Sequence, residues 1–258
     1  MRDRPGRAAA LSWASAYGVA LAPERADQQH LRPAGATLDA VFAITDQPLG
    51  VRREAGDRAV GVCRHYAVLT SAMLRAKGIP ARSRCGFASY FTPGEYVDHW
   101  VVEYWDRPQG RWRLVDSQID ALQTSALKPD FDPLDTPRDR FLIAGDAWLQ
   151  CRAGGLDPAR FGILDMRGLW FVAGNVLRDF AALNNMEMLP WDCWGPVPEN
   201  DRALSPEVLA LVDDLAALTL DADARFGEIR ALYETDASLH VPAQVFNAVR
   251  NRVEAVVL

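Results

Sequence analysis

The sequence lacks a long basic run, and its charges do not favour a polyanionic partner. The formal net charge of the 258 residues is −6. We therefore expect neither nucleic acid nor an anionic membrane to be the main partner. The apolar segment 168–183 contains Asn175, Arg178 and Asp179. It is too short and too polar to span a bilayer, so the pattern predicts a core helix.

Cysteine is also scarce. The four cysteines lie far apart, without the spacing of a disulfide scaffold or a zinc ribbon. This pattern favours a reducing compartment, and we expect a cytoplasmic protein. They are Cys63, Cys85, Cys151 and Cys193.

The N-terminal segment loosely resembles a secretion signal because arginines precede an alanine-rich stretch. Ser12, Trp13 and Tyr17 interrupt its apolar run, which favours an amphipathic helix over residues 8–22 instead. A second helix is expected over 35–45. It is followed by a loop over 46–60, which contains Pro48, Gly50, Gly56 and Asp57.

A helix is predicted over residues 61–77, since Val62, Tyr66, Leu69 and Met73 form one apolar face. Gly78 is a suitable residue to end it. Cys63 then lies in the first turn, where unpaired backbone N–H groups and the helix dipole stabilise a thiolate.

Three antiparallel strands are expected next, over residues 81–91, 97–105 and 111–116. On the second strand, His99 and Asp98 point to opposite faces, so Asp98 is badly placed to orient His99. Asp116 at the end of the third strand can reach it across the pairing. Cys63, His99 and Asp116 therefore form a candidate nucleophile, base and orienting group.

Several alternatives compete with this interpretation. A lone helical cysteine is often a small buried hydrophobic residue. His65 lies two positions from Cys63 and points away from it on a helix, so we expect a surface or supporting residue. A metal site from Cys63, His65, Cys85 and His99 lacks typical ligand spacing. Candidate substrate-binding residues, each alternatively a core residue, are Arg84, Trp100, Tyr104 and Trp191.

After residue 120 the chain is expected to be helical, with a loop over 117–135 and an aromatic loop over 189–195. Helices are predicted over 136–151, 158–164, 167–186, 206–218 and 222–234. We expect one domain over 1–258, with a catalytic core at about 57–120 and a helical C-terminal extension at about 136–258.

Four motifs resemble the transglutaminase-like superfamily. They are Gly-Val-Cys-Arg-His-Tyr at 61–66, the segment 78–87, Asp-His-Trp-Val-Val-Glu-Tyr-Trp at 98–105 and Arg-Trp-Arg-Leu-Val-Asp at 111–116. The resemblance covers residues 60–120, and the segments 131–135, 167–171 and 189–192 resemble a bacterial branch of the superfamily.

The resemblance implies an α+β fold with a papain-like helix packed on an antiparallel sheet, extended by further N- and C-terminal helices. It implies Cys63 as nucleophile, His99 as base and Asp116 as its orienting group, with no metal and no organic cofactor. The Cys63 backbone N–H is the one oxyanion donor it offers here.

The resemblance also leaves the reaction open, since members of the superfamily share an acyl-cysteine intermediate and differ in what attacks it. The first hypothesis is acyl transfer from an amide or thioester to an amine or water. The second is a Dieckmann-type cyclase that releases a carrier-bound thioester in natural-product biosynthesis, and the third is a non-catalytic binding module. The expected partner is a small-molecule, peptide or carrier-protein-bound acyl substrate.

Overall fold

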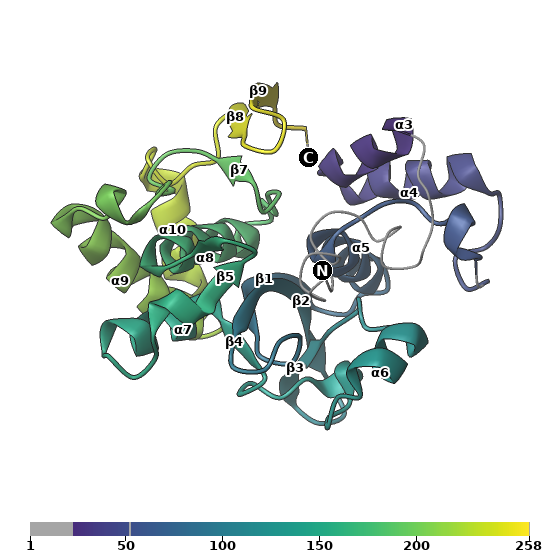
Figure 1. Ribbon diagram of the computed structural model, residues 1–258, viewed down its shortest axis with the longest axis horizontal. Coiled ribbons are helices and arrows are strands. Elements are labelled where there is room, and N and C mark those ends of the chain that lie inside the picture. Colours follow the sequence, from purple (N-terminus) through teal and green to yellow (C-terminus); the bar gives the residue numbers. More distant parts are fainter. Residues whose placement is uncertain (1–22, 52, 258) are drawn as a thin grey trace, which may run out of the picture.

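A mixed six-stranded sheet lies at the centre of the computed structural model, which describes residues 23–51 and 53–257. Strand β2 pairs antiparallel with β1 on one side and, on the other, antiparallel with β3 and parallel with β5 (Figure 1). The strands are β1 (Ala81–Ala88), β2 (Tyr96–Asp106), β3 (Arg111–Val115), β4 (Phe141–Ile143), β5 (Phe161–Ile163) and β6 (Met166–Arg167).

Two helices contact this sheet most closely. Helix α5 (Cys63–Ala76) packs on β1 and β2, and helix α8 (Leu169–Leu183) packs on β1. Helices α7 (Ala144–Arg152) and α9 (Pro206–Leu220) pack in turn on α8. The other α-helices of the described residues are α3 (Pro23–Ala26), α4 (Ala34–Ile44), α6 (Ala121–Leu127) and α10 (Phe226–Thr235).

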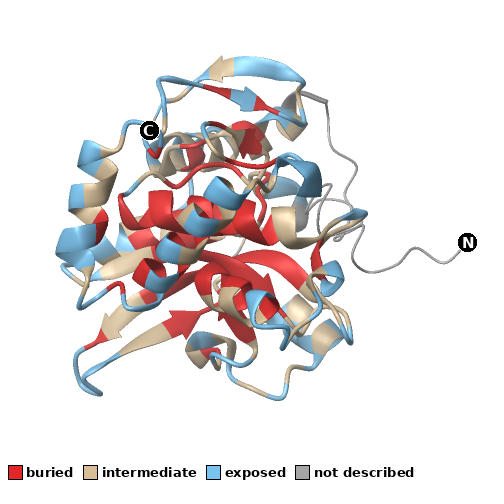
Figure 2. Cartoon of the chain, turned by 90° about the vertical axis from the view of Figure 1, so that its left-hand side faces the viewer, coloured by how far each residue is buried: buried red, intermediate tan, exposed pale blue. Residues whose placement is uncertain are grey.

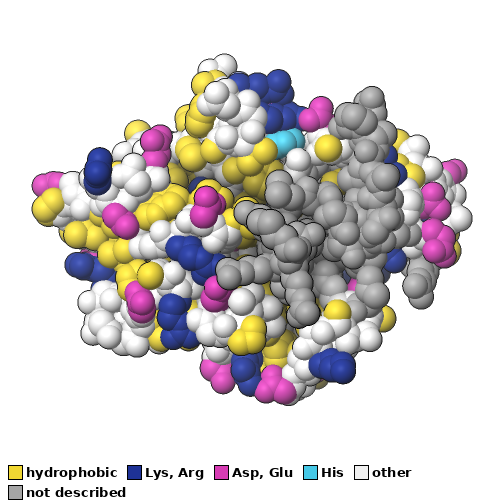
Figure 3. Space-filling view, viewed as in Figure 1, with side chains coloured by type: hydrophobic (Ala, Val, Ile, Leu, Met, Phe, Trp, Pro, Cys, Tyr) yellow, Lys and Arg dark blue, Asp and Glu magenta, His cyan; other side chains and the backbone are white. Residues whose placement is uncertain are grey.

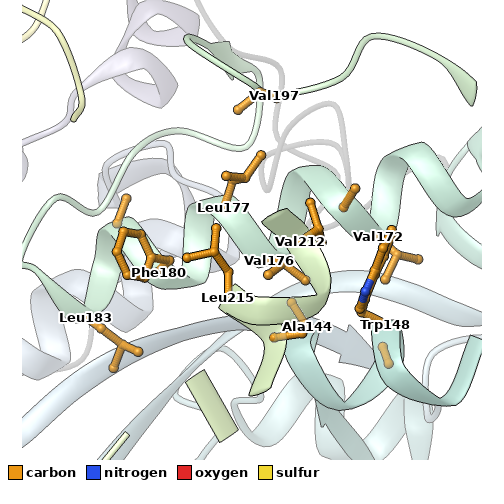
Figure 4. Packing of buried hydrophobic residues seen from close by; sticks show 14 of the residues in the cluster. Ala144, Trp148, Val172, Val176, Leu177, Phe180, Leu183, Val197, Val212 and Leu215 are labelled. Atoms are coloured by element: carbon orange, nitrogen blue, oxygen red, sulfur yellow. The ribbon is translucent and has the colours of Figure 1, made fainter. Parts of the chain in front are cut away.

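The largest apolar core surrounds α8, whose residues from Phe171 to Leu183 are all buried. Figure 4 shows Val176 and Phe180 of this helix among side chains of α7 and α9, including Trp148 and Leu215. In Figure 2 the buried residues concentrate in the sheet and the helices against it, while the outer helices carry exposed residues. Helix α8 is thus the core helix predicted from its apolar sequence.

The polar residues of α8 stay buried because each finds a polar partner. Asp179 binds the guanidinium of Arg84 at 2.7 Å and accepts a hydrogen bond from the Cys85 N–H. Asn175 donates to Asp98 at 2.8 Å. Since an unpaired buried charge is costly, these contacts are a condition for placing α8 against the sheet.

The predicted helices that correspond to α4, α5, α8, α9 and α10 are confirmed, as are the three strands that became β1, β2 and β3. Gly78 ends α5 with φ 73°, in the left-handed region that favours glycine. Ser205 caps α9 by accepting a hydrogen bond from the Val208 N–H. The predicted helix over 8–22 lies outside the described residues.

Other predicted elements were wrong. The helix expected from residue 136 begins at Ala144, because Phe141–Ile143 pairs with β1 as strand β4. Residues 158–164 form a short 3-10 turn and strand β5, since Phe161 and Gly162 pair with β2. Helix α6 lies within the expected loop 117–135.

The C-terminal extension is not purely helical. It ends in a small antiparallel sheet whose strands are β7 (Asp192–Cys193), β8 (Gln244–Asn247) and β9 (Arg252–Ala255). The hairpin of β8 and β9 exposes several apolar side chains, so its sequence lacks the alternation of apolar and polar residues that marks a half-buried strand. These exposed side chains are Phe246, Val249 and Val253.

The described surface and helices agree with the charge and hydropathy of the sequence. Figure 3 shows basic and acidic side chains interspersed on the visible face rather than separated by sign. None of the described helices is both long and apolar enough to cross a bilayer. All four cysteines are free thiols.

Candidate active site

Cys63 is the first residue of α5 and is partly exposed. The preceding residue, Val62, has an extended backbone and carries no polar side chain that could cap the helix. The N-terminal backbone N–H groups that follow are therefore open to a negative charge at this position. The prediction that Cys63 lies in the first turn of a helix is confirmed.

His65 is the third residue of α5, and its ring accepts from the N–H of the residue before the helix, as a glutamate does in a capping box. The Val62 N–H donates to Nδ1 of His65 at 3.1 Å, and Nε2 lies 2.9 Å from the carbonyl oxygen of Leu31. The ring is therefore neutral, with its proton on Nε2. Burial, then the neighbouring Arg64 charge, lower the pKa of His65 to about 3.

The prediction that His65 could lie on the surface was wrong, because it is only 3% exposed. The segment 28–31, which contacts the His65 ring, also forms hydrogen bonds with residues on both sides of Cys63. Gln28 accepts a hydrogen bond from the Val60 N–H, and the Leu31 carbonyl accepts one from Arg64. These bonds hold the start of α5 in place. His65 is therefore a supporting residue of the site, which was the other half of the prediction.

His99 and Asp116 are in contact. Nε2 of His99 lies 2.8 Å from Oδ2 of Asp116, and both side chains are buried. The register pairs Val102 with Val115, so the chain leaves β3 beside the part of β2 that carries His99. Asp98 instead accepts its hydrogen bond from Asn175 on α8, away from this pair.

The surroundings of His99 favour its protonated form. Burial alone would lower the pKa of His99, but the Asp116 carboxylate and a hydrogen bond with the Cys63 side chain raise it to about 10. Because Nε2 faces Asp116, Nδ1 is the ring atom left for the sulfur. Burial raises the pKa of Asp116, and contact with His99 reverses this effect and lowers it.

Aromatic side chains enclose His99. Phe91 packs edge-on at 4.8 Å between ring centroids, and Phe141 lies at 6.4 Å. Tyr90 lies at 6.2 Å and donates a hydrogen bond to Asp116. These rings shield the His–Asp pair from water.

On β1 the residue paired with His99 is Gly86. A side chain would not fit there, because an added Cβ would lie 2.2 Å from the Leu142 carbonyl oxygen.

The four residues predicted to bind substrate are not gathered around this pair. Arg84 is buried and bound to Asp179 and Glu103. Trp100 is 1% exposed in an apolar cluster against which Cys63 and Tyr104 pack, and its buried indole N–H has no hydrogen-bond partner among the described residues. Tyr104 is half-buried with Arg113 near its ring, and the Trp191 indole N–H donates to His30.

Three groups around the site could not be predicted from the sequence. Tyr90 and Phe91 follow β1, within a segment expected to continue as a strand, and no motif marks them. The Gln118 N–H donates to Oδ1 of Asp116 at 3.0 Å, and a backbone group leaves no sequence signal. Within the described residues, no three His, Cys, Asp or Glu side chains are grouped to hold a metal ion.

The fold and site define a class: an α+β protein in which a helix-borne cysteine, a strand histidine and an aspartate after the next strand converge as in papain-like proteins. Residues 49–117 match the family model of the transglutaminase-like superfamily. Over these residues the chain is similar to the superfamily that its motifs predicted.

A protein-glutamine gamma-glutamyltransferase of Pseudomonas aeruginosa is 30% identical over 154 residues, covering 42% of this chain and 23% of that protein. The chain therefore spans less than a quarter of the length of this relative. No solved structure matches the chain.

Proposed function

We propose that the protein is a cysteine-dependent acyl-transfer enzyme in which Cys63 carries the acyl group. The observation that carries the proposal is the 2.8 Å contact between His99 and Asp116, two buried side chains, with the partly exposed Cys63 at the start of α5 among the groups that act on His99. A buried histidine beside a partly exposed cysteine at a helix N-terminus is the arrangement that cysteine-dependent acyl transfer requires. The superfamily match and the relative from P. aeruginosa support the same class of reaction.

In the first half-reaction, the Cys63 thiolate attacks the carbonyl carbon of an amide or thioester. The oxyanion that forms lies near the N-terminus of α5, where the Cys63 backbone N–H can donate to it. When the bond to the leaving group breaks, His99 gives its Nδ1 proton to the leaving amine or thiolate. An acyl-cysteine and a neutral imidazole remain.

In the second half-reaction, His99 accepts a proton from an incoming amine or water as it attacks the acyl carbon. The carbon–sulfur bond then breaks, and the thiolate and the imidazolium are restored. Asp116 stays ionised throughout and holds the imidazole in the tautomer that presents Nδ1 to the sulfur. The buried aromatic surroundings of His99 keep this proton transfer apart from bulk water.

The test measures turnover of a glutaminyl peptide with hydroxylamine and of an acyl thioester, each with and without a primary amine. We expect turnover by the wild type and a loss of about 10⁴-fold or more in Cys63→Ala. Equal turnover by both proteins would overturn the proposal. Product masses separate the acceptors: a hydroxamate or amide for an amine, an acid for water, and a cyclic ketone for a carbon nucleophile.

A further inference from the structure

Two donors converge on one oxygen of Asp116. The Tyr90 hydroxyl donates to Oδ2 at 2.6 Å, and Nε2 of His99 lies 2.8 Å from the same atom. Oδ1 accepts from the Gln118 N–H at 3.0 Å. Turning the carboxylate about its own axis would break all three bonds. Its orientation is therefore fixed more firmly than a single bond to histidine could fix it.

Tyr90 is itself held in place from several sides. The preceding residue, Ser89, bonds to the Arg140 carbonyl through its backbone N–H at 2.9 Å and its hydroxyl at 3.1 Å. The Tyr90 ring packs on Phe91 at 4.8 Å and on Phe131 at 5.1 Å. Burial and the nearby Asp116 charge raise the pKa of Tyr90, so the phenol stays protonated and can only donate to the carboxylate.

We propose that Tyr90 is a positioning residue: its hydroxyl shares Oδ2 of Asp116 with His99, fixes the carboxylate and limits how tightly it holds the imidazole proton. The inference rests on the proposed function, in which His99 must both give and accept a proton. A donor placed on the carboxylate lowers its basicity, and it presents the positive end of its dipole to the imidazolium as well.

Within the part of the chain that the structure describes, few other charged or titratable groups face His99. Cys63 approaches from α5 and Asp116 from the end of β3, while Tyr90 comes from the loop after β1. Asp98 is its neighbour on β2 and bonds to Asn175 on the other side. Asp116 and Cys63 both stabilise the imidazolium, so Tyr90 is the neighbour that moderates their effect.

The consequence is sharpest in the second half-reaction, where neutral His99 must take a proton from the acceptor. Removing the hydroxyl in Tyr90→Phe keeps the ring but leaves Oδ2 to His99 alone. The imidazolium is then more stable, and less neutral imidazole is present near pH 7. We expect deacylation to slow about fivefold to tenfold at neutral pH. The two rates should converge at high pH, once His99 is neutral in both proteins.

The experiment acylates the protein with p-nitrophenyl acetate and follows hydrolysis of the acetyl-cysteine between about pH 6 and 11. In parallel, nuclear magnetic resonance of 15N-histidine protein follows the titration of His99, whose signal is identified by its absence in His99→Gln. In Tyr90→Phe, both the deacylation profile and the His99 titration should move to higher pH by up to about one unit. Asp116→Asn should move the titration to lower pH.

Tyr233→Phe is the matched control, because Tyr233 also bonds through its hydroxyl, to the Val241 N–H, but lies on α10. It should leave both profiles unchanged. A rate loss in Tyr90→Phe that is equal at every pH would indicate a merely structural role and overturn the proposal. So would an unchanged or lowered His99 titration. Failure of Cys63 to be acylated would count against the proposed function, and the His99 titration would still decide the role of Tyr90.

Discussion

His99 and Asp116 meet at 2.8 Å although 17 positions separate them in the sequence. The hairpin of β2 and β3 brings them together, and the aromatic rings of Phe91 and Tyr90 cover the contact. The adjacent acid, Asp98, takes no part in it, since its side chain points to α8. Strand geometry thus selects which aspartate pairs with the histidine.

Selective alkylation of Cys63 is the first expected outcome. Cys85 is buried, and burial raises the pKa of Cys85, Cys151 and Cys193. Cys63 is partly exposed beside His99. Iodoacetamide at neutral pH should therefore label Cys63 first, as peptide mass spectrometry will detect. His99→Gln should slow the labelling, and uniform or Cys193-first labelling would contradict this account of the thiolate.

The stability of the fold should depend on the His99–Asp116 pair above neutral pH. The pKa of His99 is raised from 6.5 to about 10 in the folded protein. The stabilisation is therefore fully present below about pH 6.5 and is lost as the pH rises through about 10. Thermal unfolding of the wild type should lose more stability over this range than Asp116→Asn. Parallel curves for the two proteins would show that the pair contributes no such term.

The lowered pKa of Asp116 makes the stability of the fold depend on pH at the acid end of the range. Its stabilisation is present above the ordinary aspartate pKa of 3.8 and is lost as the pH falls through the lower folded value. The difference between the wild type and Asp116→Asn should therefore shrink in strong acid as well, in the same unfolding experiments.

Arg84 should matter for stability rather than for substrate selection. It is 1% exposed and bonds to both oxygens of Asp179 and to Glu103. Arg84→Ala leaves the buried Asp179 carboxylate without its cation, which should cost about 3–5 kcal/mol in denaturant unfolding. Arg138→Ala is the control, because Arg138 also binds Glu103 but is 55% exposed, and its loss should cost about 0–1 kcal/mol. A folded, stable Arg84→Ala with altered substrate preference would restore Arg84 as a candidate binding residue.

Replacing the His65 cap should weaken the start of α5. His65→Ala leaves the Val62 N–H and the Leu31 carbonyl without the ring, so we expect a loss of about 0.5–2 kcal/mol and slower alkylation of Cys63. His65→Asn can still accept from the Val62 N–H and should retain part of both. Differential scanning calorimetry and the alkylation rate measure the two effects. Faster alkylation in His65→Ala would show that the cap does not position Cys63.

Much of the site could be predicted because its residues sit on elements with strong local signals. Cys63 begins a helix whose apolar spacing predicted its bounds, although the buried face is that of Ala67, Val68 and Ser71 and the predicted face residue Met73 is exposed. His99 and Asp116 lie on or directly after strands joined by a short turn containing Gly110. Alternation along β2 was enough to separate Asp98 from His99.

The groups that were missed depend on tertiary contacts. Tyr90 reaches Asp116 because Ser89 is tied to Arg140, 51 residues away, and no local pattern encodes that bond. Phe141–Ile143 reads as part of a helix, and it becomes a strand because β1 has an open edge. Arg84 is held by Asp179, 95 residues away. The residues near Arg84 in the sequence therefore do not show whether it forms an ion pair or binds a substrate.

Capture of an acyl group on Cys63 tests the central claim most directly. The protein is mixed with a thioester donor or a cell extract, quenched in acid within seconds and digested for mass spectrometry. The account predicts an acyl adduct on the Cys63 peptide that hydroxylamine removes, and that neither Cys63→Ala nor acid-unfolded protein acquires. An unmodified Cys63 peptide in the folded wild type under all these conditions would contradict the account, as would an adduct that forms equally well after unfolding.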